Sequence, residues 1–124
     1  MSDSPRLFDQ IDREIEIQLS RAAAANSAWQ FKRTGSGELR IEGPSGEWVT
    51  FYIVLPKNLK KSEQAGLRWQ ITFEHRPGGR LGGVIREVNA SHWPILGEIR
   101  TGQNLQTAVA GILAPYLKKR GIIR

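Results

Sequence analysis

Apolar residues near the start of the chain recur at spacings of three and four. This spacing places them on one face of an amphipathic helix. Ser4 followed by Pro5 is typical of a helix start, because serine caps the first turn and proline is favoured at the first helical position. We therefore predict a helix that begins at Ser4 and ends near Asn26. The apolar positions of its buried face are Leu7, Phe8, Ile11, Ile15, Leu19 and Ala22.

After this helix the period of the pattern changes to two. Strict alternation of apolar and polar residues predicts β-strands with one buried face. Residues 29–33, 38–42 and 67–74 alternate in this way, and a further strand weakened by glycine is expected over 81–88. Residues 47–55 are apolar at both odd and even positions. That pattern predicts a strand covered on both of its faces.

The C-terminal part of the chain combines an irregular stretch with a second helical pattern. Residues 89–102 follow no clear period, and we expect 93–96 to be an irregular segment packed into the core. Asn104 is a suitable N-cap for the helix that follows, and Gly121 a suitable stop. Pro115 should loosen the last turn, because proline lacks a backbone N–H and clashes with the preceding turn. The apolar face of this helix comprises Leu105, Ala108, Val109, Ile112, Leu113 and Tyr116.

The order of these elements predicts a single α+β domain over residues 1–124. Its parts are an N-terminal helix, an antiparallel meander of four to five strands and a C-terminal helix. Short turns favour antiparallel neighbours, and both helices would then cover one sheet face in a two-layer sandwich. A chain of this length can bury a core without disulfide or metal staples.

Several classes of chemistry have no support in the sequence. The chain has no cysteine, which excludes disulfides, thiolate nucleophiles and cysteine-ligated metals. His75 and His92 are not in a ligand-spaced motif, and the glycine-rich residues 78–83 lack the Lys-Ser/Thr of a phosphate-binding loop. We therefore expect no cofactor, no metal and no enzymatic activity. With no apolar run long enough for a membrane span, the expected location is the cytoplasm.

The charge is distributed unevenly along the chain. Residues 1–20 carry a net charge of −3 and residues 21–124 a net charge of +9, for a total of +6. A strongly basic body favours a polyanionic partner, either nucleic acid or an acidic protein.

Strand alternation predicts that basic side chains gather on the sheet face opposite the helices. Further cations are expected on the loop over 56–66, at the hairpin tip over 76–80 and at the end of the second helix. The leading hypothesis is a small protein that binds DNA or RNA through phosphate contacts, with little sequence readout. The predicted contact residues are Lys32, Arg40, Lys57, Lys60, Lys61, Arg68, Arg76, Arg80, Arg86, Lys118, Lys119 and Arg120.

A protein-interaction role is the alternative. Exposed sheet faces also carry lysine and arginine to remain soluble and to block edge pairing, without any nucleic acid. Trp48 and Tyr52 share one face of the strand that is apolar on both sides. They are candidates for base stacking, or for an interface that joins two copies or binds an acidic partner protein.

Overall fold

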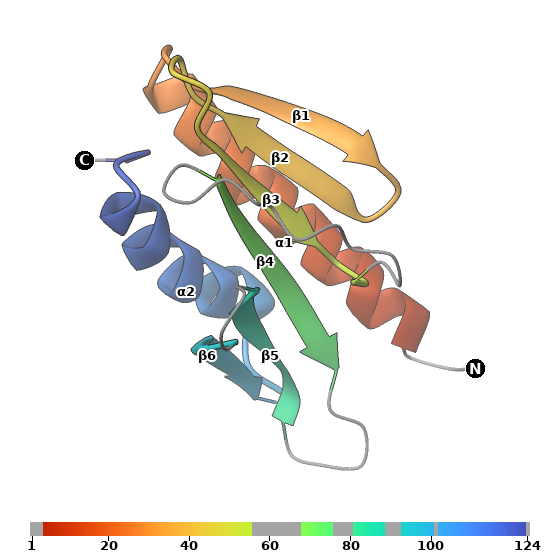
Figure 1. Cartoon of the computed structure of the whole chain (residues 1–124). Helices are drawn as coiled ribbons and strands as arrows, with labels where there is room; N and C mark the ends of the chain where they lie inside the picture. The colour runs from red at the N-terminus through yellow and green to blue at the C-terminus, as the bar shows by residue number, and fades with distance from the viewer. Residues whose placement is uncertain (1–3, 56–67, 76–80, 89–92, 101, 124) are drawn as a thin grey trace.

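A computed structural model describes residues 4–55, 68–75, 81–88, 93–100 and 102–123 of the chain. At Ser4, Pro5, Arg6, Arg68, His75 and Leu81 it describes the backbone only. Two helices flank six strands in the sequence (Figure 1). In chain order the elements are α1 (Ser4–Ala25), β1 (Gln30–Gly35), β2 (Glu38–Glu42), β3 (Trp48–Tyr52), β4 (Arg68–His75), β5 (Leu81–Val88), β6 (Ile95–Arg100) and α2 (Leu105–Lys119).

The six strands form one sheet in the order β1-β2-β3-β4-β5-β6. Four of the five neighbouring pairs are antiparallel. The pair β3–β4 is parallel, with Trp48 opposite Arg68 and Tyr52 opposite Thr72. The prediction of four to five antiparallel strands is therefore wrong in strand number and in the direction of this pair. Parallel neighbours begin at the same end of a sheet, so a tight hairpin turn cannot join them. We expected an ordinary loop over residues 56–66, and these residues lie outside the described part of the chain.

The sixth strand, β6, replaces a segment that we expected to be irregular and buried. Trp93 is 41% exposed and Ile95 47% exposed, so the prediction that residues 93–96 pack into the core is wrong for these two residues. Leu96 packs against the core cluster, as expected. The backbone N–H of Glu87 donates to the carbonyl of Pro94 at 3.0 Å, just before β6 begins. Pairing with β5 thus turns this segment into an edge strand.

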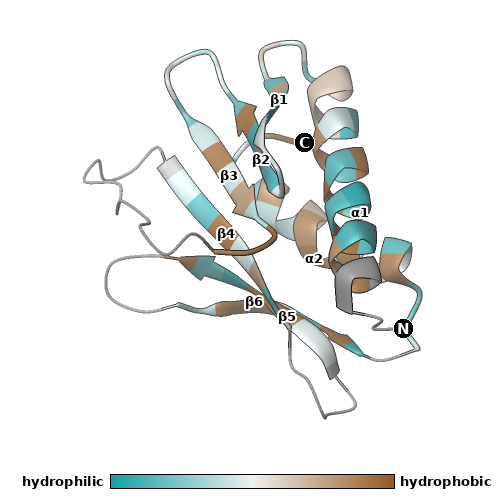
Figure 2. Cartoon of the chain, turned by 90° about the vertical axis from the view of Figure 1, so that its right-hand side faces the viewer, coloured by the Kyte–Doolittle hydropathy of each residue, from teal (hydrophilic) through white to brown (hydrophobic). Residues whose placement is uncertain are grey.

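Both helices pack on the same face of the sheet, as Figure 2 shows from the side. Ile11, Ile15 and Leu19 of α1 are at most 1% exposed and join one core cluster with Ile41 and Phe51 of the sheet. Burying each such side chain contributes about 1.5–3 kcal/mol. The amphipathic stripe predicted from the sequence is therefore the face of α1 that packs into the core.

The ends of the helices follow the sequence prediction. The Oδ1 atom of Asn104 accepts a hydrogen bond from the backbone N–H of Thr107 at 3.0 Å, which caps α2. Gly121 follows α2 with a φ of +78°, a conformation that favours glycine. Pro115 lies inside α2, which continues to Lys119.

Candidate nucleic-acid interface

Three of the predicted contact residues lie on the sheet face away from the helices. Lys32 of β1 is directly opposite Arg40 of β2. Arg86 of β5 is opposite Thr72 of β4, and β5 is three strands away from β2 in the sheet. The structure therefore brings Lys32 and Arg40 together and places Arg86 in a separate part of the same face.

Lys32 and Arg40 share one carboxylate. The Nζ atom of Lys32 lies 2.9 Å from Glu42 Oε2, and the Nη1 atom of Arg40 lies 3.5 Å from Glu42 Oε1. The hydrogen bond from Lys32, followed by its charge and the contact with Arg40, lowers the pKa of Glu42 against the opposing effect of burial. A phosphate at this position would have to compete with Glu42 for both cations.

Arg40 also anchors a small polar hollow at the end of the β2–β3 hairpin. Its Nε atom donates to Thr50 Oγ1 at 2.9 Å, and its guanidinium carbon lies 4.6 Å from the centre of the Trp48 ring. The pocket has a volume of about 500 Å³ and is lined by Arg40, Glu42, Gly43, Gly46, Glu47 and Trp48. Trp48 is thus partly exposed beside a cation, as a stacking residue requires. Its neighbours Glu42 and Glu47 are unfavourable to an anion.

Arg86 is held by two acceptors. Its Nε atom lies 3.1 Å from Glu74 Oε2, and its Nη1 atom donates to the backbone carbonyl of Trp93 at 3.0 Å. Lys32, Arg40 and Arg86 are therefore each engaged with a carboxylate.

The centre of the same face is buried within the single chain. Thr50 is 0% exposed, Thr72 4%, Tyr52 6% and Gln70 7%. This burial confirms the prediction that the strand around residue 50 is covered on both faces. It also means that Tyr52 is not presented to solvent for base stacking. We expected exposed basic side chains to cover this sheet face. The structure instead has two groups of charged residues, separated by buried polar side chains.

The basic residues at the end of α2 separate into two kinds. Lys118 and Lys119 are exposed. The Nη2 atom of Arg120 lies 2.6 Å from Glu87 Oε2, and its guanidinium carbon lies 4.6 Å from the centre of the Trp69 ring. Arg120 therefore links the C-terminal end of α2 to the sheet through Glu87 and Trp69, whereas the two lysines are exposed to solvent.

Glu87 is the acceptor at the centre of this contact. The Tyr116 hydroxyl donates to Glu87 Oε2 at 2.5 Å. Burial raises the pKa of Glu87, but the hydrogen bonds from Tyr116 and Arg120 outweigh it, and the net effect is a lowered pKa. Burial and the bond to Glu87 both raise the pKa of Tyr116. A cation, an anion and a phenol thus interact at the contact between the end of α2 and β5.

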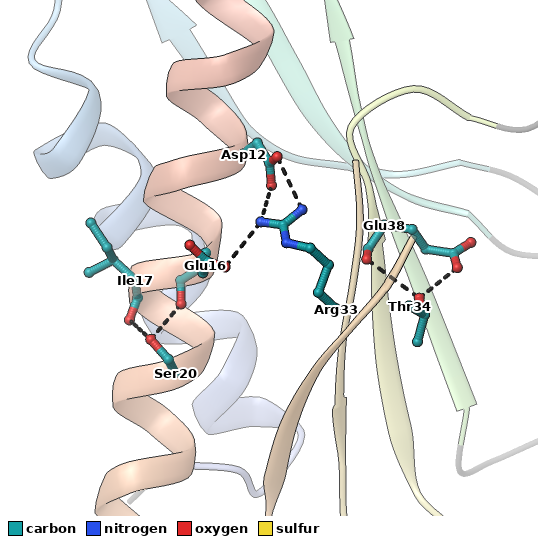
Figure 3. A network of polar contacts seen from close by, with 7 residues as sticks. All are labelled: Asp12, Glu16, Ile17, Ser20, Arg33, Thr34 and Glu38. Atoms are coloured by element: carbon teal, nitrogen blue, oxygen red, sulfur yellow. Dashed lines mark hydrogen bonds and ion pairs between the residues drawn. The ribbon is translucent and has the colours of Figure 1, made fainter. Parts of the chain in front are cut away.

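Arg33 of β1 is a further cation that forms ion pairs within the fold (Figure 3). It donates to both carboxylate oxygens of Asp12, at 3.0 and 3.2 Å, and to Glu16 at 3.1 Å. These contacts raise the pKa of Arg33, with the Asp12 hydrogen bond as the largest cause. They join the acidic side of α1 to the edge of the sheet.

The remaining predicted contact residues fall outside the described side chains. Those residues are Lys57, Lys60, Lys61, Arg68, Arg76 and Arg80. The described side chains include ten basic and ten acidic groups, so they carry no net charge. By contrast, residues 56–68 and 76–80 together contain six basic residues and one acidic residue. Most of the excess positive charge therefore belongs to the stretches of sequence on either side of β4.

Sequence reasoning missed the exposure of Trp93 and Ile95. This exposure follows from the pairing of β6 with β5 at the edge of the sheet, which no local sequence pattern indicates.

Within the described part of the chain, no three metal-ligating side chains are grouped. In the same ranges, neither helix is long and apolar enough to cross a membrane. A scan of protein-family models, a search of curated proteins and a search of solved structures each found no match.

Proposed function

We propose that this protein binds nucleic acid through its phosphates, with little reading of base sequence. The observation that carries the proposal is the location of the positive charge. Residues 56–68 and 76–80 contain six basic residues and one acidic residue, whereas the described side chains contain equal numbers of basic and acidic groups. Stretches of sequence in which cations outnumber carboxylates attract a polyanion, and their binding releases its counterions. The absence of cysteine supports a cytoplasmic location for this activity.

The proposal assigns the primary phosphate contacts to the basic residues of the two stretches that hold the excess positive charge. These residues are Lys57, Lys60, Lys61, Arg68, Arg76 and Arg80. The exposed Lys118 and Lys119 are assigned a secondary contact. The other predicted cations contribute less, because each already has a carboxylate partner; they are Lys32, Arg40, Arg86 and Arg120.

Fluorescence anisotropy with labelled single- and double-stranded oligonucleotides, DNA and RNA, tests this function. The affinity should fall by about 0.7–0.9 log units per log unit of salt for each phosphate neutralised. Lys60→Gln/Lys61→Gln should reduce that slope by about 1.4–1.8, because two contacts are lost. Arg13→Gln/Arg21→Gln removes two exposed cations from α1 and is the matched control with an unchanged slope. Absence of binding to every oligonucleotide, or binding insensitive to salt, would overturn the proposal.

A protein-interaction role without catalysis is the second candidate, and one observation favours it. Trp93 and Ile95 are large apolar side chains left 41% and 47% exposed at one edge of the sheet. Surfaces of this kind mark contacts with another protein. The partner is a second copy of the chain or an unlike protein, and the burial of Tyr52 moves the favoured surface away from the Trp48 and Tyr52 face. A defined mass in light scattering, together with no binding to oligonucleotides, would favour this role.

A further inference from the structure

Lys32 and Arg40 form a pair of cations on the sheet face away from the helices. They are directly opposite each other on the adjacent strands β1 and β2. The neighbours of Arg40 in β2, Leu39 and Ile41, belong to the core beneath the helices, so Arg40 points to the other face. Like charges directly opposite each other destabilise a strand pair. An anion close to both cations is therefore needed to hold them together.

That anion is Glu42 of β2. The Nζ atom of Lys32 lies 2.9 Å from Glu42 Oε2, and the Nη1 atom of Arg40 lies 3.5 Å from Glu42 Oε1, so each carboxylate oxygen faces one cation. Within the described residues, Glu42 is the only carboxylate that forms an ion pair with either cation. Carboxylates and phosphates both accept charge-assisted hydrogen bonds from lysine and arginine. Glu42 therefore occupies the position in which these two cations would hold a phosphate.

Arg40 is also held by groups other than Glu42. Its Nε atom donates to Thr50 Oγ1 at 2.9 Å, and its guanidinium carbon lies 4.6 Å from the centre of the Trp48 ring. Thr50 is fully buried, which fixes the position of the accepting hydroxyl. A side chain that is ordered in advance loses less entropy when a ligand binds. We therefore expect Arg40 to keep its position when Glu42 loses its charge.

Glu42 cannot leave this face of the sheet to make room for a phosphate. It lies two residues after Arg40 in β2, and residues at this spacing in a strand point to the same face. A phosphate bound to both cations would remain close to the Glu42 carboxylate even after the ion pairs had broken, and like charges repel. The hydrogen bond from Lys32 is the largest cause of the lowered pKa of Glu42, which keeps this carboxylate ionised at neutral pH. The repulsion therefore persists under ordinary conditions.

We propose that Lys32 and Arg40 form a phosphate-binding site that Glu42 keeps closed by taking the place of the phosphate. Nucleic acid then contacts the basic residues of 56–68 and 76–80, and loss of the Glu42 charge adds two phosphate contacts on the sheet. This inference rests on the proposed nucleic-acid binding and names a residue that limits its affinity.

The test is the salt dependence of binding, measured by fluorescence anisotropy with labelled single- and double-stranded oligonucleotides of DNA and RNA. Glu42→Gln removes the charge and keeps the size of the side chain. It should bind more tightly than the wild type. The slope of log affinity against log salt should become steeper by about 1.4–1.8, because two further phosphates are neutralised.

Glu47→Gln is the matched control for the change in net charge. Glu47 lines the same pocket as Arg40 and Glu42, and its Oε1 atom accepts a hydrogen bond from the backbone N–H of Ser45. It forms no ion pair within the part of the chain that the structure describes. Glu47→Gln should therefore leave the salt slope unchanged.

Lys32→Gln identifies the site when it is made in two backgrounds. In the wild type, where Glu42 holds Lys32, it should leave the salt slope unchanged. In the Glu42→Gln background it should reduce the slope by about 0.7–0.9, the value of one phosphate contact. Lys32 has a side chain that is 51% exposed, so its replacement should not disturb the fold, which circular dichroism verifies.

The outcomes separate this inference from the proposed function. If the wild type binds in a salt-dependent manner but Glu42→Gln has the slope of Glu47→Gln, nucleic-acid binding stands and the closed site is refuted. The closed site is also refuted if Lys32→Gln lowers the slope equally in both backgrounds, because Lys32 would then contact phosphate despite Glu42. If none of these proteins binds any oligonucleotide, the proposed function fails and the inference fails with it.

Discussion

The contact between α2 and β6 yields the sharpest prediction on stability. Gly97 of β6 lies directly under Ile112 of α2. A Cβ atom at Gly97 would lie 2.4 Å from Ile112 Cγ1, 2.8 Å from Cδ1 and 3.2 Å from Cγ2. Because Cγ1 is close to the backbone of α2, the side chain cannot avoid the new atom by moving only its tip. Gly97→Ala should therefore push α2 away from the sheet.

The expected cost follows from two opposing effects. Inserting a methyl group into a packed site costs about 1–3 kcal/mol. Replacing glycine within a strand returns about 0.5–1 kcal/mol of that, because alanine loses less backbone freedom on folding. Gly97→Ala should consequently lower the free energy of unfolding by about 1–2 kcal/mol.

A matched glycine on α2 should respond with the opposite sign. A Cβ atom at Gly111 would have no heavy atom within 4 Å, and Gly111 lies inside the helix. Gly111→Ala should therefore raise the free energy of unfolding by about 0.8–1.0 kcal/mol. Both variants are measured by urea unfolding followed by far-UV circular dichroism.

A double-mutant cycle identifies the cause of the loss. In an Ile112→Ala background the clash is absent, so Gly97→Ala should no longer destabilise the protein. The coupling energy between the two sites should lie within the range of about 0.5–3 kcal/mol typical of residues in contact. If Gly97→Ala is as stable as the wild type, or the two changes are additive, the close approach of α2 to β6 at this point is refuted.

Three further predictions concern single polar contacts. Glu87→Gln should cost about 1–3 kcal/mol at neutral pH, because its hydrogen bonds from Tyr116 and Arg120 lose their charge assistance. Since the folded-state pKa of Glu87 is lowered, its contribution is present above the pKa of the unfolded chain and lost as the pH falls through the folded value. The stabilities of wild type and Glu87→Gln should therefore converge in acid, and a constant difference from neutral to acidic pH would contradict this. Asn104→Ala should lower the free energy of unfolding by about 1 kcal/mol through loss of the α2 cap, and Asn104→Gly by less. Arg33→Ala should cost about 1 kcal/mol or less in urea unfolding, because its ion pairs are largely exposed; a larger cost at high salt would refute a mainly electrostatic role.

Local periodicity explains why the elements of the fold were predictable. Four predicted strands and both helices occur close to the expected residues, because amphipathic spacing reflects burial on one side of each element. The expectation that residues 47–55 are covered on both faces is confirmed for Val49–Ile53, which are buried, but it is wrong for Val54, which is 66% exposed, and β3 itself spans only Trp48–Tyr52. The direction of pairing between β3 and β4 was not predictable, since a parallel and an antiparallel neighbour present the same alternation.

The candidate site was predictable only in part. Alternation correctly placed Lys32, Arg40 and Arg86 on the face away from the helices. It could not show that Lys32 would meet Glu42 or that Arg86 would meet Glu74, because these two ion pairs cross between strands. The pair Arg40–Glu42 lies within β2, at positions two residues apart on the same face. The same limit applies to Arg33, which contacts a carboxylate 21 residues earlier in the chain.

Sequence alone thus determined which stretches are helix or strand, which side of α1 and of most strands is buried, and the net charge of +6. These properties depend on neighbours within a few positions or on composition. The tertiary structure decided the parallel pair β3–β4, the edge position of β6 and the carboxylate partners of Lys32, Arg33 and Arg86. Such features depend on distances between residues far apart in the chain, which only the packing of the helices and the order of the strands set.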